Sequence, residues 1–197
     1  NSAYIRFMMQ EKSQQSGFSL VETLVAITIL LIVIAGPLAI ISSASNSSMF
    51  ASDQVTAFLL AQEGAELAQK ARDDLVIAKF NNAAAPDPWT IFTDTAGTFA
   101  RCYEATGCGL IINSDNAGSI AVTRCNNNVN CQLQYAIDPD ERSQFVHSSS
   151  LTNPSGFTRV ITFQNTSAQE VKVVSRVTWF ASTARDAREV EVETYLF

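Results

Sequence analysis

The strongest hydrophobic pattern in the chain is an uninterrupted apolar run close to its N-terminal end. From Leu24 to Ile41 there is no charged residue, and Thr28 has the only polar side chain. A helix rises about 1.5 Å per residue, and roughly 20 apolar residues cross the hydrocarbon core of a bilayer, so the run is long enough to span a membrane. We therefore predict a transmembrane helix over residues 18–41.

Beyond the polar residues 42–48, the apolar positions take the spacing of an amphipathic helix. Small and apolar side chains recur at steps of three and four residues, as expected for a stripe that packs against a sheet. The stripe contains Ala51, Val55, Phe58, Ala61, Ala65, Ala68 and Leu75. We predict one continuous helix over residues 18–80, amphipathic from 50 to 80 and ended by turn residues at 81–87.

Two residues disturb this helical pattern. Pro37 follows Gly36 inside the apolar run, and a proline there removes one backbone hydrogen bond and kinks or locally melts a helix. We expect a helix kink at Pro37. Gly64 lies in the middle of the amphipathic part, where glycine costs about 1 kcal/mol relative to alanine. It indicates a close contact between the helix and another element.

The last third of the chain alternates in the manner of a sheet with one apolar and one charged face. Strand patterns at about 157–164, 170–180 and 188–196 are separated by turn residues. Val171, Val173, Val177 and Trp179 alternate with Lys172, Arg176 and Thr178, and Val190, Val192, Thr194 and Leu196 alternate with Glu189, Glu191 and Glu193. We predict antiparallel strands covered on one side, with opposite charges meeting across the last two.

Shorter strand patterns occur in a region rich in Asn, Ser and Gly, at 98–104, 109–113, 119–124 and 132–137. Together the patterns predict an α+β fold in which the long N-terminal helix packs on a C-terminal antiparallel β-sheet. The globular domain should cover residues 81–197, with an insert at about 98–137 and the main sheet at about 157–197.

Four cysteines, Cys102, Cys108, Cys125 and Cys131, lie in one short stretch. An even number in a domain outside the membrane predicts two disulfides. A zinc site is the competing interpretation, but zinc-binding pairs usually lie closer in sequence than these. Two pairings are open: the local pairs, or the nested pairs Cys102–Cys131 and Cys108–Cys125. The local pairs are favoured because each closes a short loop.

Composition and motifs exclude several classes of function. The net charge of −6 argues against a broad nucleic-acid surface, although Arg101, Arg124, Arg142 and Arg159 could form a local basic patch. The carboxylates at 138–141 lack the ligand spacing and glycine of a calcium loop, so a solvated turn is the preferred interpretation. His147 stands alone without a recognisable catalytic motif. We expect no enzyme activity, no metal and no cofactor.

The segment GFSLVETLVAITILLIVIAG at residues 17–36 resembles the processing and assembly signal of type IV pilins and pseudopilins. The resemblance implies that a membrane peptidase cuts after Gly17, that residues 1–17 are a leader peptide, and that Phe18 becomes the methylated N-terminus. It also implies that Glu22 stays in the apolar helix and pairs with the N-terminal amine of a neighbouring subunit. Arg6 and Lys12 precede the apolar run, which favours a cytoplasmic leader and an external C-terminal domain.

The expected function is that of a structural subunit, a minor pilin of a type IV pilus. The cysteine pairs and the Asn/Ser-rich loops favour a minor pilin. A type II secretion pseudopilin and a membrane-tethered adhesin that never polymerises are the alternatives. The resemblance implies as partners the prepilin peptidase and methyltransferase, other pilin subunits and an inner-membrane assembly platform; nucleic acid is not expected. The chain should reside in the cytoplasmic membrane before assembly and in an extracellular pilus at the cell surface afterwards.

Overall fold

The computed structural model describes Gly17 and residues 19–113, 118–125, 131–137, 143–147, 153–180 and 187–197. The chain divides into two compact units, residues 1–46 and residues 47–197. One helix, α1 (Leu20–Asn81), contributes to both. It passes through Pro37 and the polar residues 42–48 without interruption, which confirms the predicted continuity. The kink at Pro37 stays a prediction.

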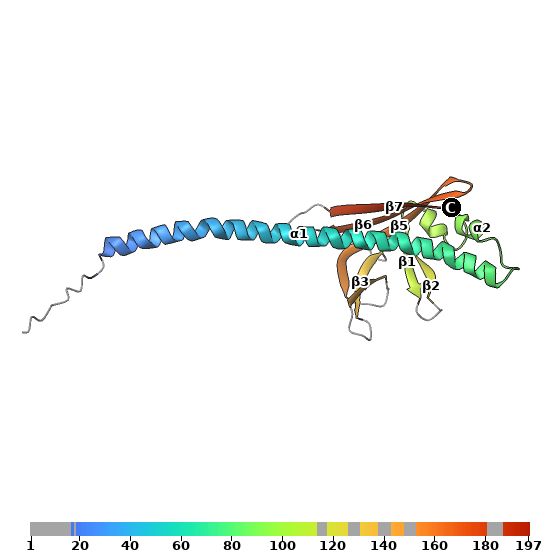
Figure 1. The fold of residues 1–197 in the computed structure, drawn as a ribbon, viewed down its shortest axis with the longest axis horizontal. Helices are drawn as coiled ribbons and strands as arrows, with labels where there is room; N and C mark the ends of the chain where they lie inside the picture. Colours follow the sequence, from blue (N-terminus) through green and yellow to red (C-terminus); the bar gives the residue numbers. More distant parts are fainter. Residues whose placement is uncertain are drawn as a thin grey trace, which may run out of the picture. The chain divides into compact units, whose positions relative to one another are not determined.

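The sheet of the second unit is organised around β5 (Pro154–Ser167) (Figure 1). One edge of β5 pairs with β6 (Glu170–Phe180), which in turn pairs with β7 (Ala187–Leu196). The other edge pairs first with β3 (Gln132–Ile137) and then with β1 (Cys108–Asn113). β1 forms a hairpin with β2 (Ser119–Arg124), and β3 forms a hairpin with β4 (Ser143–Val146). The two hairpins therefore extend from neighbouring parts of the same edge of β5.

These strands confirm most of the predicted sheet. The patterns at 109–113, 119–124 and 132–137 and the three long C-terminal patterns are strands. The strand predicted at 98–104 is wrong, because residues Ala100–Tyr103 form a 3₁₀ helix, η1. That turn brings Cys102 within bonding reach of Cys108, which an extended segment would not do. The sequence patterns also missed β4 and the short helix α2 (Pro88–Thr93).

Local chemistry explains both helix boundaries near residue 81. Lys79 donates hydrogen bonds to the carbonyls of Ala83 and Ala85 at 2.7 and 2.6 Å, so its cation holds the turn that follows α1. Helix α2 begins with a capping carboxylate: Asp87 accepts from the Thr90 backbone N–H at 2.9 Å, and Pro88 takes the first helical position. The hydrogen bonds that Asp87 accepts from the Thr90 backbone N–H and hydroxyl group lower the pKa of its exposed carboxyl.

The face of α1 that meets the sheet is only partly the predicted one. Ala61, Ala65 and Ala68 are buried, but Val55 and Phe58 are 60% and 50% exposed and Ala51 is exposed as well. The buried residues of α1 are Ala57, Leu60, Ala61, Gly64, Ala65, Leu67, Ala68 and Ala71. The prediction erred because α1 has apolar residues on two faces, and periodicity alone does not say which face the sheet covers.

A layer of polar and small residues separates two apolar clusters in the core. Toward the C-terminal end of α1, Leu67, Ala68 and Ala71 pack with Phe92, Phe163 and Val173 in the larger cluster. Toward its N-terminal end, Ala57, Leu60 and Ala61 pack with Phe157, Val177 and Trp179. Between them lie Gly64 of α1, Arg159 of β5 and Ser175 of β6, which we call the polar layer; all three are buried.

Candidate functional site

The candidate site is the N-terminal part of α1, where the sequence places the processing and assembly residues. The Ser19 carbonyl accepts from the Thr23 backbone N–H at 3.1 Å, so the first helical turn contains Glu22. A carboxylate in the first turn interacts favourably with the helix dipole. The hydroxyl groups of the two threonines in this segment donate hydrogen bonds to backbone carbonyls of the same helix. Thr23 donates to the Leu20 carbonyl, and Thr28 donates to the Val25 carbonyl. Their polar groups are thereby satisfied without water.

All described residues of this first unit are exposed, including every large apolar side chain. Ile32, near the middle of the apolar run, is 75% exposed. An apolar surface of this length favours lipid or other helices over water. By length and composition, α1 is the one helix of the described part of the chain that could cross a membrane.

The comparison with known families supports the interpretation of this segment as a processing and assembly signal. A family model described as the prokaryotic N-terminal methylation motif matches residues 12–36. The match supports a type IV pilin-like protein and fits the pilin and pseudopilin family, whose members are structural rather than catalytic. It implies processing by prepilin peptidase, assembly with other pilin subunits and membrane anchoring before assembly. Neither a curated protein nor a solved structure gives a significant match to the chain.

The matched range contains Gly17, Phe18 and Glu22. Gly17 and Glu22 are exposed. Phe18 and residues 1–16 of the predicted leader lie outside the described residues, as do the carboxylates at 138–141. The roles assigned to Gly17, Phe18 and Glu22 therefore stay predictions.

The polar layer holds α1 against the sheet through one ion pair. Arg159 is 1% exposed, and its Nη1 donates to Glu63 Oε2 at 2.8 Å and to the Leu60 carbonyl at 3.2 Å. Burial lowers the pKa of the Arg159 guanidinium, and the Glu63 carboxylate opposes that shift. The prediction that Arg159 could contribute to a basic surface patch is wrong, because its side chain is buried. Its place in the apolar alternation of β5 (Phe157, Arg159, Ile161) was the signal that it points inward.

Gly64 makes the close contact that its position in the helix indicated, which confirms that prediction. A methyl group on Gly64 would overlap Ser175 Oγ and lie 3.0 Å from Cδ of Arg159. The missing side chain thus makes room for the stem of Arg159 and lets α1 approach β6 closely.

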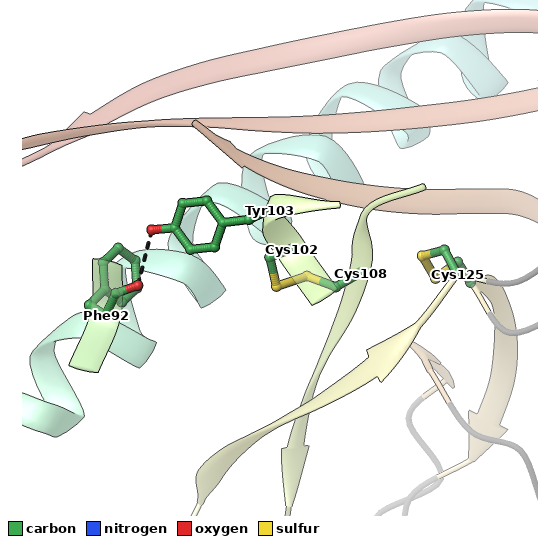
Figure 2. Close-up of a disulfide and its surroundings, with 6 residues drawn as sticks. Phe92, Cys102, Tyr103, Cys108 and Cys125 are labelled. Atoms are coloured by element: carbon green, nitrogen blue, oxygen red, sulfur yellow. Dashed lines mark hydrogen bonds between the residues drawn. A yellow bond between two sulfur atoms is a disulfide. The ribbon is translucent and has the colours of Figure 1, made fainter. Parts of the chain in front are cut away.

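The cysteines form the local pairs, Cys102–Cys108 and Cys125–Cys131. Each bond lies where a hairpin leaves β5, because Cys108 pairs with Ile161 and the Cys131 carbonyl accepts from the Arg159 backbone N–H at 2.9 Å. Figure 2 shows Cys102–Cys108 beside the side chain of Tyr103. The Tyr103 hydroxyl donates to the Phe92 carbonyl at 3.0 Å and ties η1 to α2. Burial raises the pKa of Tyr103 to about 12.

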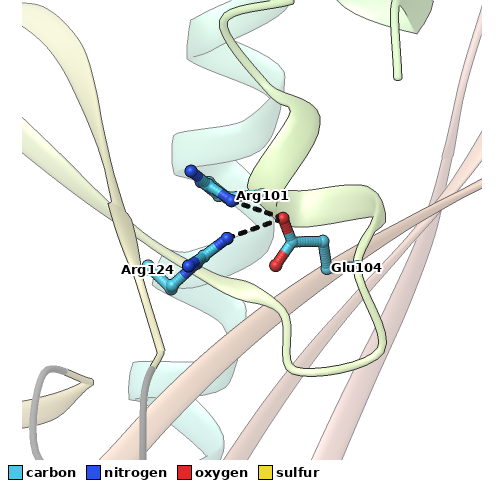
Figure 3. A network of polar contacts seen from close by, with 3 residues as sticks. All are labelled: Arg101, Glu104 and Arg124. Carbon is cyan, nitrogen blue, oxygen red and sulfur yellow. Dashed lines mark hydrogen bonds and ion pairs between the residues drawn. The ribbon is translucent and has the colours of Figure 1, made fainter. Parts of the chain in front are cut away.

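Two of the four candidate surface arginines do come together. Figure 3 shows Arg101 and Arg124 converging on Glu104, whose Oε1 accepts from both at 2.6 and 3.2 Å. The shared carboxylate offsets part of their charge. Of the other two candidates, Arg159 is buried and Arg142 lies outside the described residues.

His147 is a buried residue of the second unit. It follows β4, and a methyl group on Gly109 of β1 would lie 3.1 Å from its ring atoms. The imidazole therefore packs against the β1 backbone, between the two hairpins.

Proposed function

We propose that the chain is a minor pilin, a filament subunit of a type IV pilus that polymerises through the N-terminal part of α1. The observation that carries the proposal is the exposed, charge-free apolar helix surface that begins at Leu24, just after Glu22 and within the methylation motif. A solvent-exposed helix of this composition is stable only in lipid or against other helices, and a subunit that leaves the membrane for a filament uses both environments in turn.

Glu22 supplies the directional element of the proposed assembly. After cleavage at Gly17, Phe18 would carry the new N-terminal ammonium group, and Glu22 would lie about one helical turn away in the sequence. A carboxylate in an apolar environment is costly unless a cation pairs with it. The N-terminal amine of a neighbouring subunit is a suitable partner, and the pairing would set the axial register between subunits.

The two disulfides and the covered sheet support a role outside the cytoplasm. Disulfides persist in oxidising compartments, and here they staple the hairpins that bury few apolar residues of their own. Such a disulfide-stapled domain would suit the external part of a pilus subunit.

The first test is the intact mass and N-terminal sequence of the protein from sheared surface filaments and from membranes. We expect a chain that starts at methylated Phe18 in the sheared filaments. Processed protein confined to membranes would point instead to a pseudopilin or a tethered adhesin. A chain that retains residues 1–17 would contradict the processing step itself.

The second test separates assembly from anchoring. Glu22→Gln keeps the size of the side chain but removes its charge, and we expect it to leave membrane insertion intact and to reduce incorporation into filaments at least tenfold, since loss of an ion pair of about 1.4 kcal/mol has that effect. Glu66→Gln, an exposed position on the same helix, is the matched control. Equal incorporation of both variants would contradict the role proposed for Glu22.

A further inference from the structure

The C-terminal strand β7 forms the longest edge of the sheet. It pairs with β6 from Val171↔Leu196 to Phe180↔Ala187 without a shift in register, and no strand among the described residues pairs with its other side. Figure 1 shows β7 at the margin of the sheet, with β6 between it and β5. Such an edge presents backbone N–H and C=O groups that can accept an additional strand.

β7 has charged side chains on its outward face, but it lacks other features that block an edge, namely proline and a β-bulge. Its sequence, AREVEVETYL, contains no proline or glycine, and its pairing shows no bulge. Val190 and Val192 point to the core side, where they are only partly buried and pack against the smaller cluster. The apolar face of the sheet is thus incompletely covered along this edge.

Helix α1 runs beneath β7 and provides further apolar surface. At one end of the strand Arg188 lies over the ring of Phe50, at 5.8 Å from its centre, and at the other end Arg72 Nη1 donates to the Phe197 carbonyl at 2.9 Å. Phe58 precedes Arg72 by two heptads, so it lies near the same side of the helix, and it is half exposed. An added strand would place its inward side chains beside this surface.

The outward face of β7 decides the charge of the partner. Lys172 pairs with Glu193 at 2.6 Å and Arg176 pairs with Glu191, whereas Glu189 is 4.0 Å from Arg176 with its side chain 63% exposed. Three carboxylates thus share two cations. Antiparallel pairing of β7 with a second copy of itself would set these glutamates against each other, which disfavours self-association. A strand with Lys or Arg on its outward face would complement them.

We infer that the free edge of β7 is a docking site for an extended segment of another protein, in which basic outward side chains alternate with apolar inward ones. Backbone hydrogen bonds supply the affinity, and the glutamate row selects the charge of the segment. The inference uses only residues 47–197, so it does not depend on the filament function proposed above.

The test uses the full chain in detergent micelles and a synthetic peptide of alternating Lys and Val, about as long as β7. Fluorescence anisotropy measures binding, and hydrogen exchange locates it. We expect saturable binding that protects the amides of residues 187–196, roughly tenfold tighter than for a matched Glu/Val peptide. Glu189→Lys should weaken binding of the Lys/Val peptide, and Glu66→Lys, which makes the same charge change on the exposed side of α1, should not.

A third peptide distinguishes strand addition from charge attraction. The Lys/Val peptide with N-methyl groups on alternate residues along its β7-facing edge keeps its charge but cannot form the backbone ladder, and we expect it not to bind. Equal binding of the N-methylated peptide, equal binding of the Glu/Val peptide, or failure of the Lys/Val peptide to protect β7 would each overturn the inference. Concentration-dependent dimerisation of the chain through β7 would overturn the choice of partner.

Discussion

Among single residues, Arg159 and Gly64 determine how α1 fits the sheet. The Arg159 guanidinium is buried between two apolar clusters, and its carboxylate partner Glu63 lies on α1 with its side chain 45% exposed. Burying a charge is costly unless it is paired and hydrogen-bonded. In the observed arrangement α1 presents both Glu63 and Gly64 to Arg159, so the guanidinium is paired and its stem has room.

Removing the two partners of this ion pair should have unequal effects. Glu63→Gln leaves the buried guanidinium without its counter-charge, and we expect the free energy of unfolding to fall by roughly 1–3 kcal/mol, less than for a fully buried pair because Glu63 reaches solvent. Arg159→Met keeps an apolar stem and removes the charge, and it should change stability by less than about 1 kcal/mol. Denaturant unfolding of the full chain in micelles measures both, with Glu66→Gln as control. Greater damage from Arg159→Met would contradict this account.

Gly64→Ala should be destabilising although alanine is the better helix former. The added methyl group overlaps Ser175 Oγ and crowds Arg159, an overpacking cost of about 1–3 kcal/mol, against a gain of about 1 kcal/mol in helix propensity. Ser175→Ala in the same chain should recover part of the loss. The control is Gly36→Ala, where nothing lies within 4 Å of the new methyl group. Thermal unfolding of these three variants and of Ser175→Ala alone tests the coupling, and strictly additive effects would argue against the contact.

At the scale of elements, the disulfides and Tyr103 fix short helices and hairpins that bury little apolar surface on their own. Helix α2 has six residues and η1 has four, and both rest on the aromatic cluster of Phe92, Phe99 and Phe163. Tyr103 bridges them through its hydroxyl group and packs edge-on against Phe163. These short elements therefore depend on tertiary contacts rather than on helix propensity.

Tyr103 should make the stability of this region sensitive to alkaline pH. Its pKa is raised from 10.0 to about 12, so the folded state retains a proton that the unfolded state releases. The contribution is complete below pH 10 and is lost as the pH rises through about 12. We expect the denaturation midpoint to fall across that range, and to fall less in Tyr103→Phe, which has no proton to release. Identical pH profiles for the two proteins would contradict the assignment.

At the scale of the whole molecule, two units with different solvents share one helix. Residues 47–197 bury their own core, whereas all described residues of the first unit are exposed. The apolar surface of the first unit therefore favours lipid or neighbouring helices over water.

A charge in the middle of the apolar run should prevent stable membrane anchoring. Ile32→Lys places an ammonium group near the helix centre, at a cost of about 3 kcal/mol on insertion scales. We expect much of the variant to be released when membranes are extracted with alkaline carbonate, while Ser45→Lys, beyond the run, should remain with the membranes. Full retention of Ile32→Lys would show that the run does not act as the anchor.

Sequence patterns predicted the long C-terminal strands because each side chain reports its own face by simple alternation, as Val171, Lys172 and Val173 do. They predicted for the same reason that opposite charges meet across the last two strands, and the pairs Lys172–Glu193 and Arg176–Glu191 confirm this. They failed at residues 98–104, where a 3₁₀ turn that reaches a distant cysteine overrides an extended pattern. They failed also along α1, where apolar residues on two faces left the packing face undetermined.

The sequence alone determined that the chain has a long N-terminal helix with a charge-free apolar run, a methylation motif around Gly17, Phe18 and Glu22, and an antiparallel sheet with one charged face. These properties depend on composition and on periods of two and 3.6 residues, which are local. Only the tertiary structure decided that Arg159 is buried against Glu63, that each cysteine pairs with its neighbour, and that β7 is an edge. These properties depend on which distant segments meet, and that choice minimises the free energy of the packed chain as a whole.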